Sequence, residues 1–374
     1  MTSILRARRG LLLSLGIPLV SVLLALGVAG ALLWANGTDP LAAYRSMAEA
    51  AFGSTFALST TIVKALPRLL PALGIALALR AGLWNVGAEG QLYMGALAAA
   101  GVALYGPELT FPVGTALALL AAVVAGSLWG AIPGVLRAKR GISEVITSLM
   151  LVYVAINFTN YVVEGPWLMS GSTFPGTEAV PSELRLPIIW SGTLLNAGVI
   201  VAAAVVLVVA FVLSRTVFGL QLRAIGGNER ASRVAGVPVG WVTVAALMAS
   251  GALAGLAGGI EVLGSRGRLI EGFSPGYGFE AIAIALLGRL SPWGIVGAAL
   301  LFGALDAGGA ALQTTAEGVS AAIVPITEGV AVIFVLIGMG IVDHLARRRR
   351  AAEMLGRSQD RGTGAVPDAV GTGA

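Results

Sequence analysis

The sequence predicts an all-α, polytopic membrane protein with about ten transmembrane or re-entrant helices. Hydrophobic residues make up 57% of its 374 residues and charged residues only 11%, whereas water-soluble domains carry about 25% charged residues. The mean hydropathy is +0.88. Apolar runs that approach the roughly 20 residues needed to cross a membrane recur along the chain, and basic residues cluster between alternate runs.

The composition also excludes several kinds of chemistry. The chain has no cysteine and one histidine, His344, which rules out disulfides and thiolate metal sites and disfavours a histidine-based metal centre or a catalytic triad. It contains no G-x-x-x-x-G-K-[ST] phosphate-binding loop. We therefore predict a chain that is not an enzyme, holds no metal or other cofactor, and does not itself bind ATP.

The N-terminal residues predict a cytoplasmic start and two membrane spans. Three arginines precede an apolar run from Leu11 to about Ala35, which is longer than the roughly 7–15-residue core of a secretory signal and is expected to be a retained helix. Asn36 to about Thr60 is a polar connection, and the second span runs from about Thr61 to Leu79. In that span Lys64 and Arg68 lie one turn apart, and we expect them to extend to the membrane interface rather than to line a cavity.

The third span, about Leu83 to Tyr105, opens with a polar stretch in an otherwise apolar region. Asn85, Glu89 and Gln91 arrive within seven residues, in a segment that also holds four glycines. A carboxylate at membrane depth costs roughly 2.5 kcal/mol or more and usually faces a cavity, and the glycines permit a break in the helix. One interpretation is therefore a polar lining for the path of a hydrophilic solute.

A second interpretation of the same stretch stays open. In it, a helix starts at the water side with Asn85 as its N-cap, and Glu89 lies in the first turn near the positive end of the helix dipole. The neighbouring aromatic rings could stack on a solute, or they could anchor the chain at the membrane interface, which is their commoner use. The candidate path residues are thus Trp84, Asn85, Glu89, Gln91 and Tyr93.

The middle of the chain predicts three further spans, at about Pro112–Leu136, Ile142–Val163 and Leu194–Leu213. Three basic residues between 137 and 140 follow the first of these spans at once. The connection from Glu164 to Thr193 is a long polar loop with four prolines and no cluster of basic residues. This contrast in charge places the first connection in the cytoplasm and the long loop outside.

The stretch from Arg215 to Gly240 is too polar to span a membrane and too patterned to be a mere tether. Its charged, polar and small residues include Arg223, Gly226, Gly227, Asn228, Glu229, Arg230, Arg233 and Gly236. A short amphipathic helix of this composition could lie in the groove of a soluble partner, with glycines at 227 and 236 for a tight turn and a close approach to that partner. A basic interfacial loop is the alternative.

The last third of the chain predicts a packed helix, a short helix and two more spans. Gly251, Gly255 and Gly259 recur every four residues in a seventh span, about Trp241 to Leu263, and small residues on one face let helix backbones approach closely. The run from Glu280 to Leu287 is too short to cross and is expected to re-enter or to tilt strongly. Spans at about Trp293–Leu312 and Ala321–Val342 follow, with Asp306 and Glu328 inside them.

The distribution of charge favours cytoplasmic N- and C-termini. With the N-terminus inside, 18 of the 24 basic residues fall in cytoplasmic segments, in agreement with the positive-inside rule. The other six are Arg45, Lys64, Arg68, Arg185, Arg266 and Arg268. The four arginines at 347–350 are expected to anchor the end of the last span, and the basic, then Gly-rich tail from 347 to 374 is expected to be disordered.

Four stretches resemble one family, the integral membrane subunits of bacterial ATP-binding-cassette (ABC) importers in the branch of branched-chain amino acid, ribose and nucleoside permeases. Residues 222–236 resemble the cytoplasmic coupling loop of this branch, and residues 82–91 resemble the signature of its nucleoside or simple-sugar group. Residues 143–150 and 278–288 agree with that group. Asn85-Val86-Gly87 stands where ribose permeases typically carry Asp-Leu-Ser, which argues against ribose.

The resemblance covers about residues 60–345 and implies a division of labour. Residues 1–346 would form a single permease domain in the cytoplasmic membrane, beside a second permease subunit that is a related but different chain. A cytoplasmic ABC ATPase would drive it through the 215–240 loop, and an extracellular or periplasmic solute-binding lipoprotein would deliver the solute. The implied mechanism is alternating access, and the implied solute is a nucleoside. An ABC permease for a simple sugar is the alternative within this family. An ion-coupled secondary transporter is the alternative outside it. No nucleic-acid partner is expected.

Overall fold

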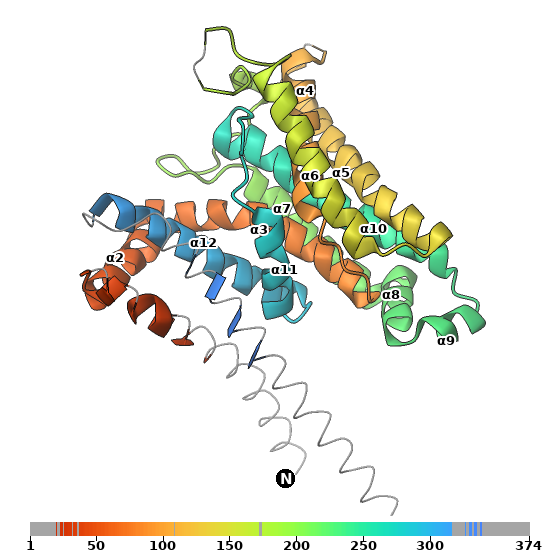
Figure 1. Ribbon diagram of the computed structural model, residues 1–374. Helices are drawn as coiled ribbons and strands as arrows, with labels where there is room; N and C mark the ends of the chain where they lie inside the picture. Colours follow the sequence, from red (N-terminus) through yellow and green to blue (C-terminus); the bar gives the residue numbers. More distant parts are fainter. Residues whose placement is uncertain are drawn as a thin grey trace, which may run out of the picture. The chain divides into compact units, whose positions relative to one another are not determined.

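The computed structural model describes residues 20, 23–24, 26–31, 33–35, 37–107, 109–171, 174–315, 326, 329–330, 333–334 and 337–338. Within these residues the chain is helical, with two isolated β-bridges and no β-strand (Figure 1). The predicted all-α class is therefore confirmed. The chain divides into two units, residues 33–324 and residues 1–32 with 325–374, and helices α2 to α12 all belong to the first unit.

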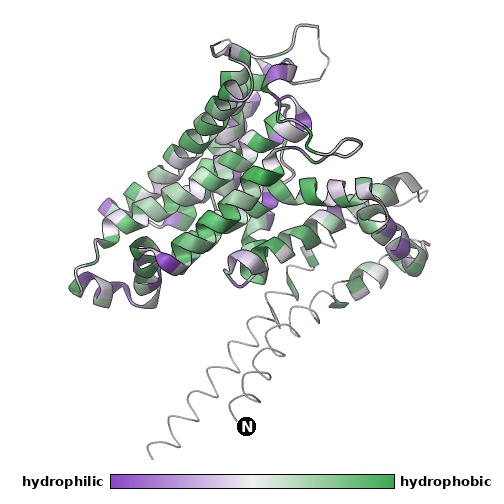
Figure 2. Cartoon of the chain, turned by 180° about the vertical axis from the view of Figure 1, so that it is seen from behind, coloured by the Kyte–Doolittle hydropathy of each residue, from purple (hydrophilic) through white to green (hydrophobic). Residues whose placement is uncertain are grey.

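Six helices of the described residues are long and apolar enough to cross a membrane. They are α3 (Thr55–Arg80), α5 (Val113–Arg140), α6 (Glu144–Glu164), α7 (Gly198–Arg215), α10 (Val239–Ile260, continued by the π-helical turn η2, Glu261–Arg266) and α12 (Pro292–Thr315). The other elements are α2 (Pro40–Phe52), α4 (Ala88–Tyr105), the 3₁₀ turn η1 (Ser182–Leu184), α8 (Val217–Gly227), α9 (Glu229–Val234) and α11 (Tyr277–Leu287). Figure 2 shows that the long helices are mostly hydrophobic and that hydrophilic residues gather at helix ends and in connections.

The segment predicted as a polar connection, residues 36–60, is instead mostly helical. Asp39 caps α2 by accepting a hydrogen bond from the backbone N–H of Leu41 at 2.9 Å, with a proline at the first helical position. Ser54 caps α3 in the same way, accepting from the N–H of Ala57 at 3.0 Å. The second span therefore begins at Thr55 rather than at about Thr61, and the connection before it contains a capped 13-residue helix that is too short to cross a membrane.

Some predicted elements lie wholly or largely outside the described residues. These are the first span, the tenth span with Glu328, and the tail from residue 347.

Helix α10 packs against α3, α4 and α5, and its glycines bring the backbones together as their spacing predicted. A Cβ on Gly251 would overlap the carbonyl oxygen of Gly126, and one on Gly255 would lie 2.9 Å from the Cα of Gly126. A Cβ on Gly258 would overlap the carbonyl oxygen of Leu92, a residue of α4. The backbones of α4, α5 and α10 therefore touch with no side chain between them.

Helix α11 is short, as predicted for residues 280–287. Its 11 residues extend about 16 Å at 1.5 Å per residue, roughly half of the hydrocarbon thickness of a membrane. Gly276, with a φ of 115°, precedes it, and Gly288 ends it. Arg289 and Leu290 then both have positive φ angles, of 54° and 56°. Helix α11 is thus a short, largely buried helix between two sharp turns.

Candidate functional site

The polar stretch before α4 does not cap the helix in the way that its sequence suggests. Helix α4 begins at Ala88 with Gly87 as its N-cap, so Asn85 lies outside the helix. The side-chain oxygen of Asn85 instead accepts a hydrogen bond from the backbone N–H of Gly87 at 3.1 Å. The helix-start interpretation is correct in placing Glu89 in the first turn of α4 and wrong in assigning the cap to Asn85.

Asn85 and Gln91 form a buried pair of amides. Nδ2 of Asn85 donates to Oε1 of Gln91 at 2.8 Å, and Nε2 of Gln91 donates back to Oδ1 of Asn85 at 3.1 Å. Asn85 Nδ2 also donates to Oγ of Ser250 on α10, at 2.8 Å. Both amides are only 1% exposed, so their hydrogen bonds to protein atoms join the start of α4 to α10.

The carboxylate of Glu89 lies at the N-termini of two helices, α4 and α11. It lies in the first turn of α4, and its Oε2 accepts the backbone N–H of Gly278, in the first turn of α11, at 2.6 Å. The side chain of Ser274 makes a further hydrogen bond to the carboxylate. The free N–H groups and the dipoles of both helices compensate for the burial of this charge, and a Cβ on Gly278 would overlap the backbone nitrogen of Glu89. Glu89 therefore holds α11 against α4.

The two candidate aromatic residues have different surroundings. The buried ring of Tyr93 packs edge-to-face on Phe273, with 4.6 Å between ring centroids, and its hydroxyl donates to the carbonyl oxygen of Ser274 at 3.4 Å. Trp84 is 46% exposed, and its backbone N–H donates to Oε1 of Glu144 at 3.4 Å. Tyr93 thus lies where α4 meets the segment before α11, and Trp84 lies at the surface.

A second polar group joins α3, α11 and α12. Arg68, near the middle of α3, pairs with Glu280 of α11 and, at 3.0 Å, with Asp306 of α12. Lys64 pairs with the same Asp306 at 2.9 Å. The guanidinium group of Arg68 also lies 4.6 Å from the centroid of the Tyr277 ring, within range of a cation–π interaction. We call these five residues the central cluster.

The central cluster corrects the expectation that Arg68 extends to the membrane interface. The side chain of Arg68 is 2% exposed, because carboxylates from two other helices surround it. The sequence held a signal for this, since Glu280 and Asp306 are acidic residues in otherwise apolar runs and buried charges require partners. The pairing itself joins residues 212 and 238 positions apart, which no local pattern encodes.

The patterned stretch from 215 to 240 forms two short helices, α8 and α9, which connect α7 to α10. Asn228 caps α9 by accepting the N–H of Ala231 at 3.0 Å, and Glu229 pairs with Arg233 one turn later at 3.0 Å. All eight of the predicted coupling residues are exposed, and the apolar Val234 is 90% exposed. The stretch therefore presents a helical, polar surface with an apolar residue at its tip.

The glycines of this stretch have distinct roles. Gly236 has a φ of 84°, which confirms the predicted tight turn. Gly226 packs on the end of α3, where a Cβ would overlap the carbonyl oxygen of Arg80. Gly227 has open space around it and does not need a positive φ. The chain itself therefore has room for a side chain at position 227.

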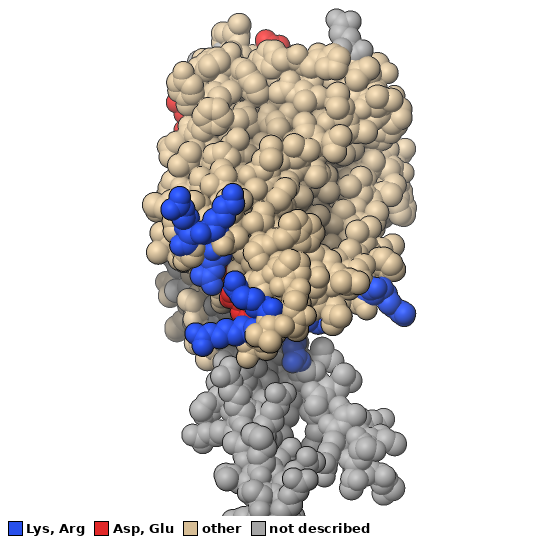
Figure 3. All heavy atoms as spheres, turned by 90° about the vertical axis from the view of Figure 1, so that its right-hand side faces the viewer, with Lys and Arg blue, Asp and Glu red and all other residues tan. Residues whose placement is uncertain are grey.

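Basic side chains gather at the end of the unit that carries α8 and α9. Gly240, at the start of α10, lies against Ala138, near the end of α5, so the basic end of α5 adjoins this surface. The exposed basic residues are Lys139, Arg140, Arg215, Arg223, Arg230 and Arg233. Figure 3 shows the concentration on a face that otherwise carries few charges.

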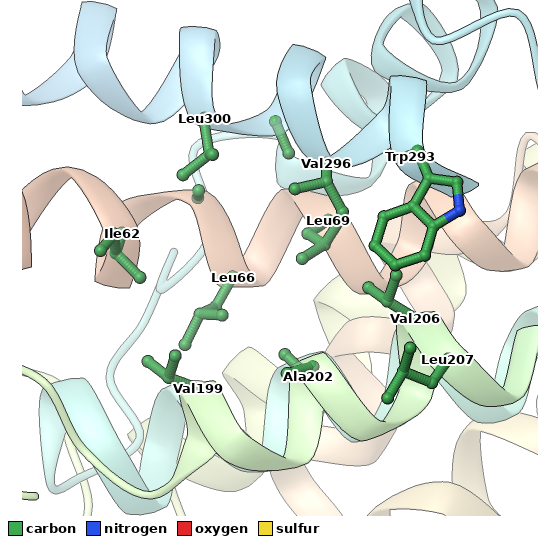
Figure 4. Close-up of a pocket in the computed structure, with 13 residues that line it drawn as sticks. Ile62, Leu66, Leu69, Val199, Ala202, Val206, Leu207, Trp293, Val296 and Leu300 are labelled. Carbon is green, nitrogen blue, oxygen red and sulfur yellow. The ribbon is translucent and has the colours of Figure 1, made fainter. Parts of the chain in front are cut away.

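An apolar groove of about 370 Å³ lies between α3, α7 and α12 (Figure 4). Leu66, Val206 and Trp293 are among the residues that line it, and every lining side chain is hydrophobic. Leu66 and Arg68 are two residues apart, which separates them by about 200° around a helix with 3.6 residues per turn. Helix α3 therefore presents the groove on one side and the central cluster on the other.

Comparisons with known proteins point to a single kind of transport subunit. Residues 57–339 match the family described as "Branched-chain amino acid transport system / permease component". The glucose ABC transporter permease protein TsgB13 of Haloferax volcanii is 38% identical over 371 residues, which cover 96% of this chain and 94% of the relative. The guanosine ABC transporter permease protein NupP of Bacillus subtilis is 35% identical over 326 residues, 85% of this chain and 92% of the relative. No solved structure matches the chain.

Proposed function

Because the chain belongs to the family of branched-chain amino acid transport system permease components, and is a permease subunit of an ABC importer for nucleosides or sugars, we propose that its solute is a nucleoside. It is a multi-pass protein of the cell membrane and not an enzyme, and a separate ATPase hydrolyses ATP. Relatives named for guanosine and for nucleosides support this solute. The relative named for glucose makes a simple sugar the second candidate.

The solute path in this proposal passes the first turn of α11. The observation that carries this placement is the buried Glu89 carboxylate, which holds the N-termini of α4 and α11 together. Transporter sites commonly use the ends of short or interrupted helices in this way. Glu89 and Tyr93 border the path. Asn85 and Gln91 position α4 beside it. Trp84 lies at the entrance of the path. Alternating access then requires α11 to shift relative to α4.

The basic end of the unit faces the cytoplasm in this proposal, with both termini on the same side. The exposed basic residues around α8 and α9 support that orientation. Helices α8 and α9, with the eight predicted coupling residues, dock on the cytoplasmic ABC ATPase. A related second permease chain and a solute-binding lipoprotein outside the cell complete the importer.

Replacing Gly227 with tryptophan is expected to uncouple ATP hydrolysis from transport. The exposed space at Gly227 accepts a side chain, so the permease should insert and melt like wild type while the bulky ring separates α8 from the ATPase. We expect at least a tenfold loss of solute moved per ATP hydrolysed, measured in proteoliposomes with the complete importer. Gly227→Ala is the matched control and should retain coupling. Full coupling in the tryptophan variant would contradict the assignment of α8 and α9 to docking.

Cells that express the complete importer are expected to accumulate radiolabelled nucleosides. Adenosine, guanosine, uridine, cytidine, ribose and glucose should each be tested, and uptake of sugars alone would exclude the nucleoside assignment. Glu89→Ala should lower nucleoside uptake at least tenfold, because it releases α11 from α4. Glu49→Ala is the control, since Glu49 forms an exposed ion pair with Arg45. Unchanged uptake in Glu89→Ala would make the contact a purely structural one.

A further inference from the structure

The central cluster places charged groups halfway along two long helices. Arg68 lies near the middle of the 26-residue α3, and Asp306 lies near the middle of the 24-residue α12. At 1.5 Å per residue, Arg68 is about 18–20 Å from either end of α3, and Asp306 is about 21 Å from one end of α12 and about 14 Å from the other. Ionised side chains at such a depth are costly and mark solute or ion pathways. The cluster is therefore at the depth where a transported solute would pass.

The cluster is also on the side of α3 that faces away from the wholly apolar groove. The groove, lined by Leu66 and Leu69 of α3 and by Val296 of α12 (Figure 4), is a surface that suits lipid chains or apolar helices. Lys64 and Arg68 point elsewhere on the same helix. The two faces of α3 thus separate an apolar environment from a polar one.

The side chains of the central cluster differ in their exposure to solvent. Arg68 is fully buried, whereas the side chains of Lys64, Glu280 and Asp306 are 31%, 20% and 24% exposed. Nε of Arg68 pairs with Oε2 of Glu280, and Asp306 pairs through both of its oxygens, Oδ1 with Lys64 and Oδ2 with Arg68. Arg68 therefore acts as an internal cation that orients two carboxylates, whose side chains are partly exposed.

Helix α11 connects this cluster to the contact that Glu89 makes. Glu89 holds Gly278, and the cluster holds Tyr277 and Glu280 in the same first turn of α11. Arg266 of η2 also contacts this turn, since its side chain makes a hydrogen bond to Tyr277. Arg266 pairs in addition with Glu261 at 3.0 Å. Polar groups from α3, α4, η2 and α12 therefore converge on one end of a half-length helix, as in transporter sites built from interrupted helices.

We propose that the central cluster is a solute-contact site that binds the hydroxyl groups of the sugar ring of the solute. The inference rests on the proposed function and deepens it. Glu280 and Asp306 accept hydrogen bonds from neighbouring hydroxyls, and charge-assisted hydrogen bonds of this kind are about twice as strong as neutral ones. Lys64 donates to a hydroxyl or ring oxygen. Nucleosides and simple sugars share these hydroxyls, so the site recognises the part that both solute classes have in common.

Matched solutes with and without hydroxyls test this assignment. The complete importer is supplied with saturated delivery protein carrying either uridine or 2′,3′-dideoxyuridine, or glucose and a dideoxyglucose if the wild type imports sugars. In Glu280→Gln and Asp306→Asn, we expect the maximal rate for the hydroxyl-bearing solute to fall about tenfold and the rate for its deoxy counterpart to fall less than about twofold. A structural role alone would lower both rates by the same factor, and that result would overturn the site. If the wild type imports neither nucleosides nor sugars, the proposed function itself fails.

Water access to the cluster gives a second test, which needs no measurement of transport. The chain has no cysteine, so Lys64→Cys introduces a single thiol while Asp306 keeps its pair with Arg68. A charged, water-soluble methanethiosulfonate should label position 64 of the assembled importer, and bound solute should slow the labelling several-fold. Leu207→Cys, in the apolar groove, is the matched control and should stay unlabelled. No labelling at position 64, with or without ATP, would overturn the inference.

Discussion

Replacing Arg68 with methionine is expected to lower the free energy of unfolding of the permease by about 3–5 kcal/mol, the usual cost of removing one partner of a buried ion pair. Methionine retains much of the apolar stem of arginine but leaves Glu280 without the cation that compensates for its burial. Asp306 keeps its pair with Lys64. The loss should appear as a lower melting temperature and a lower denaturant midpoint of the purified chain in lipid nanodiscs.

Two control variants separate this electrostatic effect from a loss of packing. Adding Glu280→Gln to the Arg68→Met variant removes the uncompensated charge and should recover at least half of the lost stability. Arg45→Met breaks an ion pair whose side chains are 82% and 66% exposed, and exposed pairs contribute only about 0–1 kcal/mol. A loss below about 1 kcal/mol in Arg68→Met, or no recovery in the double variant, would show that Arg68 does not compensate the charge of Glu280.

Replacing Gly255 with alanine is expected to destabilise the permease by about 1–3 kcal/mol, and replacing it with leucine is expected to prevent folding. One methyl group at this position would overlap the carbonyl oxygen of Ala122 and lie 2.9 Å from the Cα of Gly126. On the other side, the Cα of Gly255 already meets Gly95 of α4. Both obstacles are backbone atoms, so α4, α5 and α10 would have to separate. Folded yield and thermal unfolding in detergent measure the effect.

The matched control is a glycine in another long helix that has room for a methyl group. Gly297 of α12 has no neighbouring atom in the direction of its Cβ. Gly297→Ala should therefore leave stability unchanged or raise it by up to about 1 kcal/mol, since alanine favours a helix over glycine. If Gly255→Ala behaves like Gly297→Ala, the close backbone packing of α10 does not contribute to stability.

The parts of the fold that sequence could predict are those encoded within a few residues. The spacing of Gly251, Gly255 and Gly259 predicts a close helix contact because one helix turn brings them to one face. The capping residue Asn228 and the pair Glu229–Arg233 lie within one turn, so the short helix α9 follows from local pattern. The cap of α2 is also encoded locally, because Asp39 is followed by Pro40 and this pair indicates a helix start. The charged residues around it favoured a polar connection instead.

The candidate site depends on partners that are distant in sequence. Asn85 lies before Gly87, the N-cap of α4, and Gln91 and Ser250 complete its hydrogen bonds, the latter from 165 positions away. The spacing of Asn85 and Glu89 cannot reveal this, since it presumes a continuous helix. Arg68 illustrates the same limit, because an arginine within an apolar run fits an interfacial anchor until its two carboxylates are known. The roles of the predicted path and coupling residues stay predictions.

The glycine contacts of α10 have a mechanical consequence. Helix α10 begins a few residues after α9 and ends in η2, whose Arg266 reaches Tyr277, so its 22 residues form a rod of about 33 Å between the basic end and the central cluster. Interlocked backbones block sliding by fractions of a helix turn, because packed interfaces move between discrete arrangements rather than deforming continuously. In the proposed coupling, a displacement of α9 by the ATPase would move α4, α5 and α10 as one stiff body and would so reach η2. The parts of the permease that would change their arrangement are then α11 and the sharp turns on either side of it.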